Sequence, residues 1–214
     1  MATASHRDSI GVDARSALSP FTYAADLLDP PGSEFAEAAQ LSSQSLAQFT
    51  KDAWPLLEPR TQLIWGWYLD AICEHLEAVT RGEIKQLLIN VPPRHSKSTI
   101  IGVTWPAWEW LTQPQERYLS VSHSADLAVR DAARTRRLMQ STGGASSGTV
   151  LQRIGYRGAL SYLAQTWQFT GDQNVKSRYE NDKTGHRIAT GLGGGATGEG
   201  GSRIICDDPH KLEE

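Results

Sequence analysis

The chain has 214 residues, with 21 Lys and Arg against 24 Asp and Glu and a formal net charge of −3. This balance excludes a protein that coats nucleic acid through bulk positive charge, so any DNA contact has to come from a local patch. Hydrophobic residues make up 39% of the chain, which is enough for a packed core and excludes wholesale disorder. The length fits one α/β domain, alone or with a small helical annex.

The chain carries two cysteines, Cys73 and Cys206, at a separation that matches no metal-ligand spacing. A disulfide framework and a zinc site are therefore disfavoured, and a reducing compartment is the default. No stretch reaches the ~18–20 consecutive apolar residues of a membrane span, and residues 1–8 lead into no apolar segment typical of a secretory signal. We expect a soluble cytoplasmic protein without a membrane partner.

The first part of the chain divides by its hydrophobic pattern. Residues 1–32 are polar, show no period and end in Asp-Pro-Pro-Gly, which predicts a flexible arm, with a partner-binding tail as the alternative. Apolar residues recur at helical spacing over 33–51 and again over 61–80, and Gly82 stands where a helix C-terminus favours glycine. Residues 33–82 are therefore expected to form a helical annex.

From residue 83 onward, short apolar runs alternate with helix-compatible segments. The elements expected here, in chain order, are a strand at 86–91, a helix at 97–111, a strand at 117–122, a helix at 125–140 and strand-like pieces at 167–170, 186–190 and 203–206. Pro106 is expected to kink or end the first part of the helix at 97–111. This alternation predicts a layered α/β domain with a mainly parallel sheet flanked by helices. The Gly- and Ser-rich residues 141–148 are expected to form a loop.

A phosphate-binding loop is suggested by Leu-Leu-Ile-Asn-Val-Pro-Pro-Arg-His-Ser-Lys-Ser-Thr at 87–99. An apolar strand runs into a tight loop and Lys-Ser opens a helix, which is the layout in which backbone N–H groups surround phosphates. Lys97 would reach the β- and γ-phosphates, and the Ser98 hydroxyl would ligate Mg²⁺. The common pattern has glycine where this chain has Val91 and Ser96, so an ordinary surface loop is the alternative.

An acidic segment further along the chain complements this loop. Arg-Ile-Ile-Cys-Asp-Asp-Pro at 203–209 is a short apolar strand that ends in two acids. In a Walker B motif, a carboxylate at the end of a strand holds Mg²⁺, and the following acid orients or deprotonates the attacking water. Asp207 would take the first role and Asp208 the second, although a turn that begins with Asp is the simpler alternative. Together the two segments favour an ATPase.

These segments resemble the large terminase subunit of tailed bacteriophages, the motor that packages DNA into capsids. The resemblance spans roughly residues 60–210 and rests on the segments 87–98, 105–110 (Trp-Pro-Ala-Trp-Glu-Trp), 169–174 (Phe-Thr-Gly-Asp-Gln-Asn), 197–201 (Thr-Gly-Glu-Gly-Gly) and 204–210. That family commonly replaces the first glycine of the phosphate loop, and Pro-Pro-Arg-x-(Gly or Ser)-Lys-Ser is typical of it.

The resemblance implies a P-loop NTPase-like fold with an ATP site. Arg94 matches the loop arginine that senses or stabilises the γ-phosphate, and Asp208 falls where many relatives carry the catalytic Glu. Ser98 and Asp207 match the residues that hold Mg²⁺. The residues implied to bind the nucleotide are Pro93, Arg94, His95, Ser96, Lys97, Ser98 and Thr99.

The implied reaction is the attack of water on the γ-phosphate of Mg-ATP, coupled to DNA translocation. The implied partners are double-stranded DNA, a small terminase subunit, the capsid portal and further copies of the chain in a ring, in the cytoplasm of the bacterial host. Residues 142–166 depart from the family, and the sequence stops soon after Asp208, where relatives continue with more strands and a nuclease domain. We expect a truncated ATPase core at 83–214 with an incomplete sheet; the alternatives are a non-catalytic prophage remnant and another, helicase-like P-loop ATPase.

Two further patterns leave alternatives open. Residues 193–198 match G-x-G-x-x-G, but the following segment reads as a strand, which favours a glycine-rich loop over a dinucleotide site. Arg130, Arg134 and Arg137 share one helical face. That face is either solvated, in contact with DNA phosphates, or the source of an arginine finger for a neighbouring subunit.

Aromatic residues cluster on both sides of the phosphate loop. The three tryptophans of segment 105–110 are expected in the core. Trp65, Trp67 and Tyr68 precede the loop, where an aromatic ring that stacks on adenine would be useful. The sequence does not select one of them.

Overall fold

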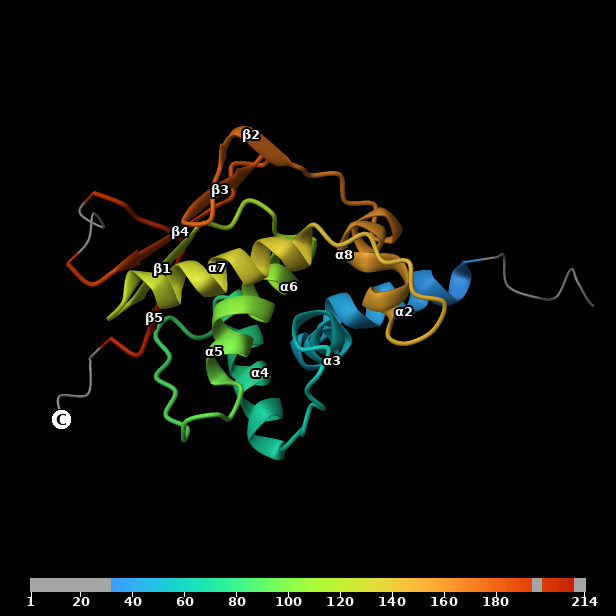
Figure 1. Ribbon diagram of the computed structural model, residues 1–214, viewed down its shortest axis with the longest axis horizontal. Coiled ribbons are helices and arrows are strands. Elements are labelled where there is room, and N and C mark those ends of the chain that lie inside the picture. Colours follow the sequence, from blue (N-terminus) through green and yellow to red (C-terminus); the bar gives the residue numbers. More distant parts are fainter. Residues whose placement is uncertain (1–31, 194–197, 210–214) are drawn as a thin grey trace, which may run out of the picture. The chain divides into compact units, whose positions relative to one another are not determined.

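The computed structural model describes residues 32–193 and 198–209. The arm predicted at 1–32 therefore lies outside the described residues except for Gly32, and the same holds for the middle of the glycine-rich segment 193–198. The described residues form an α/β arrangement in which a five-stranded mixed sheet is flanked by helices (Figure 1). The helices, in chain order, are α2 Ser33–Gln44, α3 Leu46–Leu57, α4 Trp67–Thr80, α5 Lys97–Thr99, the π-helix η1 Ile100–Thr104, α6 Trp105–Thr112, α7 Ala125–Met139 and α8 Val150–Tyr162.

The single helix predicted at 33–51 is two helices, α2 and α3. Ser45 separates them because its backbone is extended (φ −134°, ψ 119°) and its side chain accepts a hydrogen bond from the N–H of Gln48, which is the geometry of a helix N-cap. The helix predicted at 61–80 begins later, at Trp67, after an extended Gly66. It ends as predicted, with Gly82 in the left-handed region at φ +78°.

The segment 97–111 is helical as predicted, but the kink or end expected at Pro106 is not a break: α5, η1 and α6 follow one another without a gap. Its π-helical segment adjoins Pro106, which has no N–H to donate to the preceding turn. The carbonyl of Gly102 instead lies 3.2 Å from the hydroxyl of Thr135 on α7. The helix therefore passes Pro106 without breaking.

The sheet contains β1 Tyr118–Ser122, β2 Phe169–Asn174, β3 Arg178–Asn181, β4 His186–Gly191 and β5 Arg203–Asp207, in the order β2-β3-β4-β1-β5. β1 pairs in parallel with β4 and β5, whereas β3 pairs antiparallel with both β2 and β4. The prediction of a mainly parallel sheet is therefore wrong. The connections at 175–177 and 182–185 are too short for the crossover that parallel strands need.

The strand predicted at 86–91 is also wrong, because this segment belongs to no ladder of the sheet. A cleft of about 750 Å³ has this segment along one side and β5, the edge strand of the sheet, along the other. Leu87, Ile89 and Ile204 line the cleft. A strand requires hydrogen bonds to a neighbour, and this segment, which lies across the cleft from β5, pairs with no strand of the sheet.

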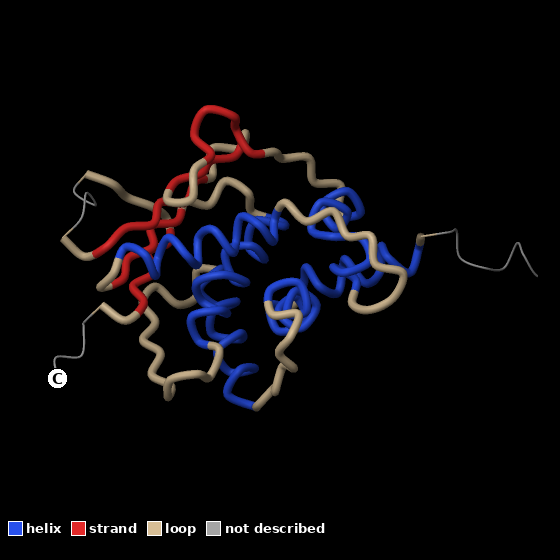
Figure 2. Tube along the Cα trace, viewed as in Figure 1, coloured by secondary structure: helices blue, strands red, loops and turns tan. Residues whose placement is uncertain are grey.

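The core lies between the sheet and the helices, with α7 packed on β1 and β4 and η1 packed on β5 (Figures 1 and 2). The three tryptophans of segment 105–110 are buried as predicted. The ring of Trp110 lies 5.4 Å from that of Trp167 in an edge-to-face contact, which ties α6 to the segment before β2. No helix in the described part of the chain is long and apolar enough to cross a membrane.

Candidate functional site

Loop 92–96 is held in an unusual backbone conformation. Arg94 (φ 66°) and Ser96 (φ 60°) both lie in the left-handed region, which side chains other than glycine rarely adopt. Ser96 occupies the position where the common phosphate-loop pattern has glycine, and its φ gives the physical reason for that preference. Asp208, at φ 44°, is also left-handed. Such strain in one place is typical of functional sites.

Lys97, the first residue after this loop, joins the two predicted motifs. Its ammonium nitrogen lies 3.1 Å from Oδ1 of Asp207 and 2.8 Å from Oδ1 of Asp208. The side chains of Lys97 and Asp207 are mostly buried, at 21% and 23% exposed, while that of Asp208 is 62% exposed. The structure thus brings the loop and the acidic end of β5 together.

The surroundings of Lys97 favour its charged form. Burial alone would lower the pKa of the amine, but the hydrogen bonds to Asp208 and Asp207, together with the charges of the two carboxylates, outweigh burial and raise it. Lys97 therefore faces two carboxylates at the carboxyl ends of parallel strands β1 and β5, which is where ligands bind in open α/β sheets.

The backbone of Asp208 is held by contacts with the residue that follows β1. The N–H of His123, the residue after β1, donates to the carbonyl of Asp208 at 3.2 Å, and His123 Nδ1 lies 3.0 Å from the same oxygen. Asp207 lies opposite Ser122 in the parallel register of β1 and β5. His123 is a site residue that the sequence reasoning missed, because nothing in its local pattern marks a contact 85 residues away.

The other predicted loop residues take different places. Pro93 and Arg94 are exposed, and Arg94 has no hydrogen-bond or ion-pair partner among the residues that the structure describes. Nδ1 of His95 lies 3.1 Å from the carbonyl oxygen of Pro92 and 2.9 Å from that of Pro93, so the imidazole folds back onto the loop. Ser98 is half-buried beside Lys97.

Thr99 faces α7 instead of the loop. Its hydroxyl accepts a hydrogen bond from Arg134 Nη1 at 3.3 Å. Arg134 also donates to Glu58 at 2.5 Å and lies 3.9 Å from Asp131, and its side chain is only 15% exposed. The interpretation of Arg134 as part of a solvated helix face is therefore wrong. Arg137, which shares that face, is exposed. Arg134 positions Thr99, and its partner Glu58 could not be found from local spacing.

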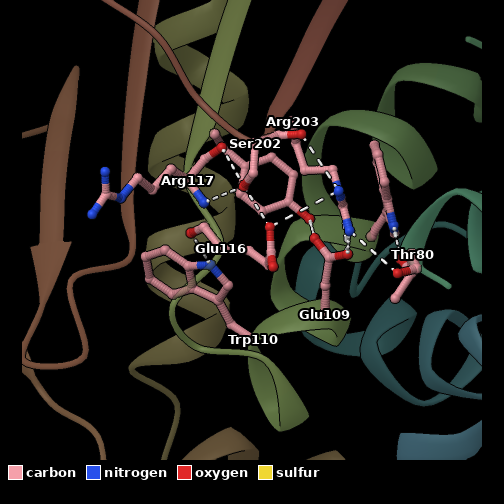
Figure 3. Close-up of polar contacts among 9 residues, drawn as sticks. Thr80, Glu109, Trp110, Glu116, Arg117, Ser202 and Arg203 are labelled. Atoms are coloured by element: carbon pink, nitrogen blue, oxygen red, sulfur yellow. Dashed lines mark hydrogen bonds and ion pairs between the residues drawn. The ribbon is translucent and has the colours of Figure 1, made fainter. Parts of the chain in front are cut away.

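A buried ion pair fixes the start of β5 (Figure 3). Arg203 donates to Oε1 of Glu109 from Nη2 at 2.8 Å and from Nε at 3.1 Å, and Nη2 also reaches the carbonyl of Thr80 at 3.3 Å. The Tyr118 hydroxyl donates to the other oxygen of Glu109, whose side chain is fully buried. These contacts hold β5 against α6 and β1, and so set the position of Asp207 at its far end.

The donor set at the end of β5 suits Mg²⁺, which proteins bind through one or two carboxylates together with water and phosphate oxygens. Asp207 and Asp208 supply two carboxylates that already share one cation, Lys97. The described residues contain no group of three or more His, Cys, Asp or Glu side chains placed to hold a metal on their own. Water and phosphate oxygens would therefore have to complete such a site.

Comparison of the chain with protein-family models, curated proteins and solved structures finds no match. The resemblance to terminases therefore rests on the segments of the sequence themselves.

Proposed function

We propose that this chain binds Mg-ATP at loop 92–96 and the carboxyl end of β5, and that it hydrolyses the γ-phosphate bond. The observation that carries the proposal is the contact of Lys97 with Asp207 and Asp208. Sequence reasoning assigned these residues separately to a phosphate loop and to an acidic strand end, and the fold places them within hydrogen-bond distance. An ordinary surface loop does not account for a contact of Lys97 with both carboxylates.

The proposed roles of the side chains follow from their charges. Lys97 and the exposed Arg94 supply positive charge to the phosphates, while Ser98 and Asp207 would hold Mg²⁺. When bound, Mg²⁺ neutralises charge on the β- and γ-phosphates. Asp208 carries the more exposed carboxylate, and it would orient the attacking water and accept its proton.

The ammonium of Lys97 changes partner in this scheme. Without nucleotide it pairs with both carboxylates, and with nucleotide it would move to the phosphates, so that Asp207 would be free to hold Mg²⁺. The strained backbone at Arg94 and Ser96 supports the same assignment, because it turns loop 92–96 tightly before Lys97.

The wider role proposed is that of the motor part of a phage DNA-packaging terminase, a P-loop NTPase that couples hydrolysis to DNA translocation. This proposal rests on the five sequence segments that resemble the family. Double-stranded DNA, a small terminase subunit, the capsid portal and a ring of copies are its proposed partners, in the bacterial cytoplasm.

Equilibrium binding of Mg-ATP by calorimetry tests the site. We expect Lys97→Ala to weaken binding at least tenfold, because it removes the charge that meets the phosphates. Lys183→Ala is the matched control: this exposed lysine lies in the turn before β4, at the opposite end of the parallel strands. Equal binding by the unmodified chain and Lys97→Ala would refute the proposal.

A further inference from the structure

A tryptophan stands exposed next to loop 92–96. Trp67, the first residue of α4, has 81% of its surface open to solvent. A large aromatic side chain in that position contributes little to the core, and exposed aromatic surface marks binding sites.

Two ring contacts connect Trp67 to the loop. The ring of Trp67 lies 6.4 Å from that of Tyr68, edge to face, and the ring of Tyr68 lies 5.4 Å from that of His95. His95 is itself fixed, because its Nδ1 lies against the carbonyls of Pro92 and Pro93. The three rings therefore form a row that begins in the loop and ends in solvent at Trp67.

Gly66 permits this arrangement. A Cβ at this position would lie 2.5 Å from Cε1 of Tyr68, so any larger residue would displace the tyrosine ring. The absence of a side chain at Gly66 lets Tyr68 fold back beside its own backbone and remain in contact with His95.

The neighbouring Trp65 already has polar and cation–π contacts within the chain. Trp65 donates its indole N–H to Asp70 at 2.8 Å, and the ammonium of Lys51 lies 4.4 Å from the ring centre. Its ring is half-buried. Of the three aromatic residues that precede the loop, Trp67 is the one with a ring open to a ligand.

We infer that Trp67, supported by Tyr68, is the platform on which the base of the bound nucleotide stacks. The inference rests on the proposed function: His95, where this row of rings meets loop 92–96, stands two residues before Lys97. Stacking of a base on an aromatic side chain tolerates any base, so the platform adds affinity for nucleotides over inorganic phosphates.

Parallel titrations with Mg-ATP and magnesium tripolyphosphate test the platform, since the second ligand has the phosphates without the base. We expect Trp67→Ala to weaken ATP binding about tenfold, to leave tripolyphosphate binding unchanged, and to be rescued by Trp67→Phe. Ile64→Ala is the control, because Ile64 is 83% exposed and has no ring. Equal ATP binding by Trp67→Ala, or equal losses for both ligands, would overturn the platform.

A rival base site is the cleft beside β5, where Ile204 is 67% exposed. Loss of ATP affinity in Ile204→Ser but not in Trp67→Ala would assign the base to that cleft and overturn the inference. Failure of the proposed function looks different. In that case the unmodified chain does not bind tripolyphosphate, or Lys97→Ala binds it equally well.

Discussion

Nζ of Lys97 and Oδ1 of Asp208 lie 2.8 Å apart, although 111 residues separate them in the chain. The pair connects loop 92–96 to the end of β5. Most of Asp208 is exposed, and water therefore screens much of the attraction. The contact is better suited to exchange with a ligand than to stabilising the fold.

The first prediction concerns the contribution of this contact to stability. Asp208→Asn should lower the free energy of unfolding by about 1 kcal/mol or less, because this carboxylate is mostly exposed; urea denaturation measures the difference, which should shrink in high salt. A loss of about 3–5 kcal/mol would instead indicate a structural ion pair, and would contradict the assignment of Lys97 to a ligand.

The second prediction concerns the strained loop. Ser96→Gly should raise the free energy of unfolding by up to about 1 kcal/mol, because glycine adopts φ 60° without the steric penalty that serine has there. Ser96→Val should destabilise the fold, because a β-branched residue is poorly tolerated at positive φ. Thermal denaturation of both variants measures the effect, and the opposite order of stabilities would exclude the left-handed conformation at this position.

The third prediction concerns the buried ion pair at the start of β5. Arg203→Met leaves the carboxylate of Glu109 buried without its cation, and should lower the free energy of unfolding by about 3–5 kcal/mol. Adding Glu109→Gln should recover part of this loss. The control Arg81→Met removes an exposed ion pair with Glu83 and should leave stability unchanged. Equal effects of Arg203→Met and Arg81→Met in urea denaturation would contradict the burial of Glu109.

The fourth prediction separates the two thiols. Cys206 is exposed and Cys73 is buried, and burial raises the pKa of the Cys73 thiol to about 12. A thiol reagent at mildly alkaline pH should therefore modify Cys206 rapidly and Cys73 only after denaturant is added. In Cys206→Ser the fast phase should disappear; if it persists, Cys73 is accessible in the folded chain.

The fifth prediction is loss of stability in alkali. Burial raises the pKa of Tyr118, Tyr156 and Tyr179, and the charge of Glu109 adds to this at Tyr118. The unfolded chain releases these protons near the ordinary tyrosine pKa of about 10, while the folded chain keeps them. The free energy of unfolding should therefore fall as pH rises above about 10. Phenolate absorbance from these three residues in the folded state would contradict their burial.

The sequence singled out the segments that hold Lys97 and Asp207, whereas it did not reveal the order of the strands around them. Lys97 and Asp207 could be assigned because each stands in a short pattern of neighbouring residues. The strand order depends on contacts between distant segments, and β3 at Arg178–Asn181 was missed because four residues carry too little periodicity. Likewise, α8 at Val150–Tyr162 was missed, although its capping box of Thr149 and Gln152 is a local signal of a helix start.

Residues that act through distant partners could not be predicted. Arg134 looked like part of a solvated helix face, but it lies between Glu58 and Thr99. The segment 86–91 has the apolar pattern of a strand, yet that pattern does not reveal that the segment lies across a cleft from β5 without pairing to it. In both cases the structure was decided by packing partners that local spacing does not identify.

The most direct test of a shared nucleotide site is a double-mutant cycle on Mg-ATP binding with Lys97→Met, Asp207→Asn and the combined variant. If Lys97 and Asp207 act on the same bound Mg-ATP, each single variant should bind at least tenfold more weakly, and the combined loss should be smaller than the two losses added together. Binding by either single variant that equals that of the unmodified chain would contradict a shared site.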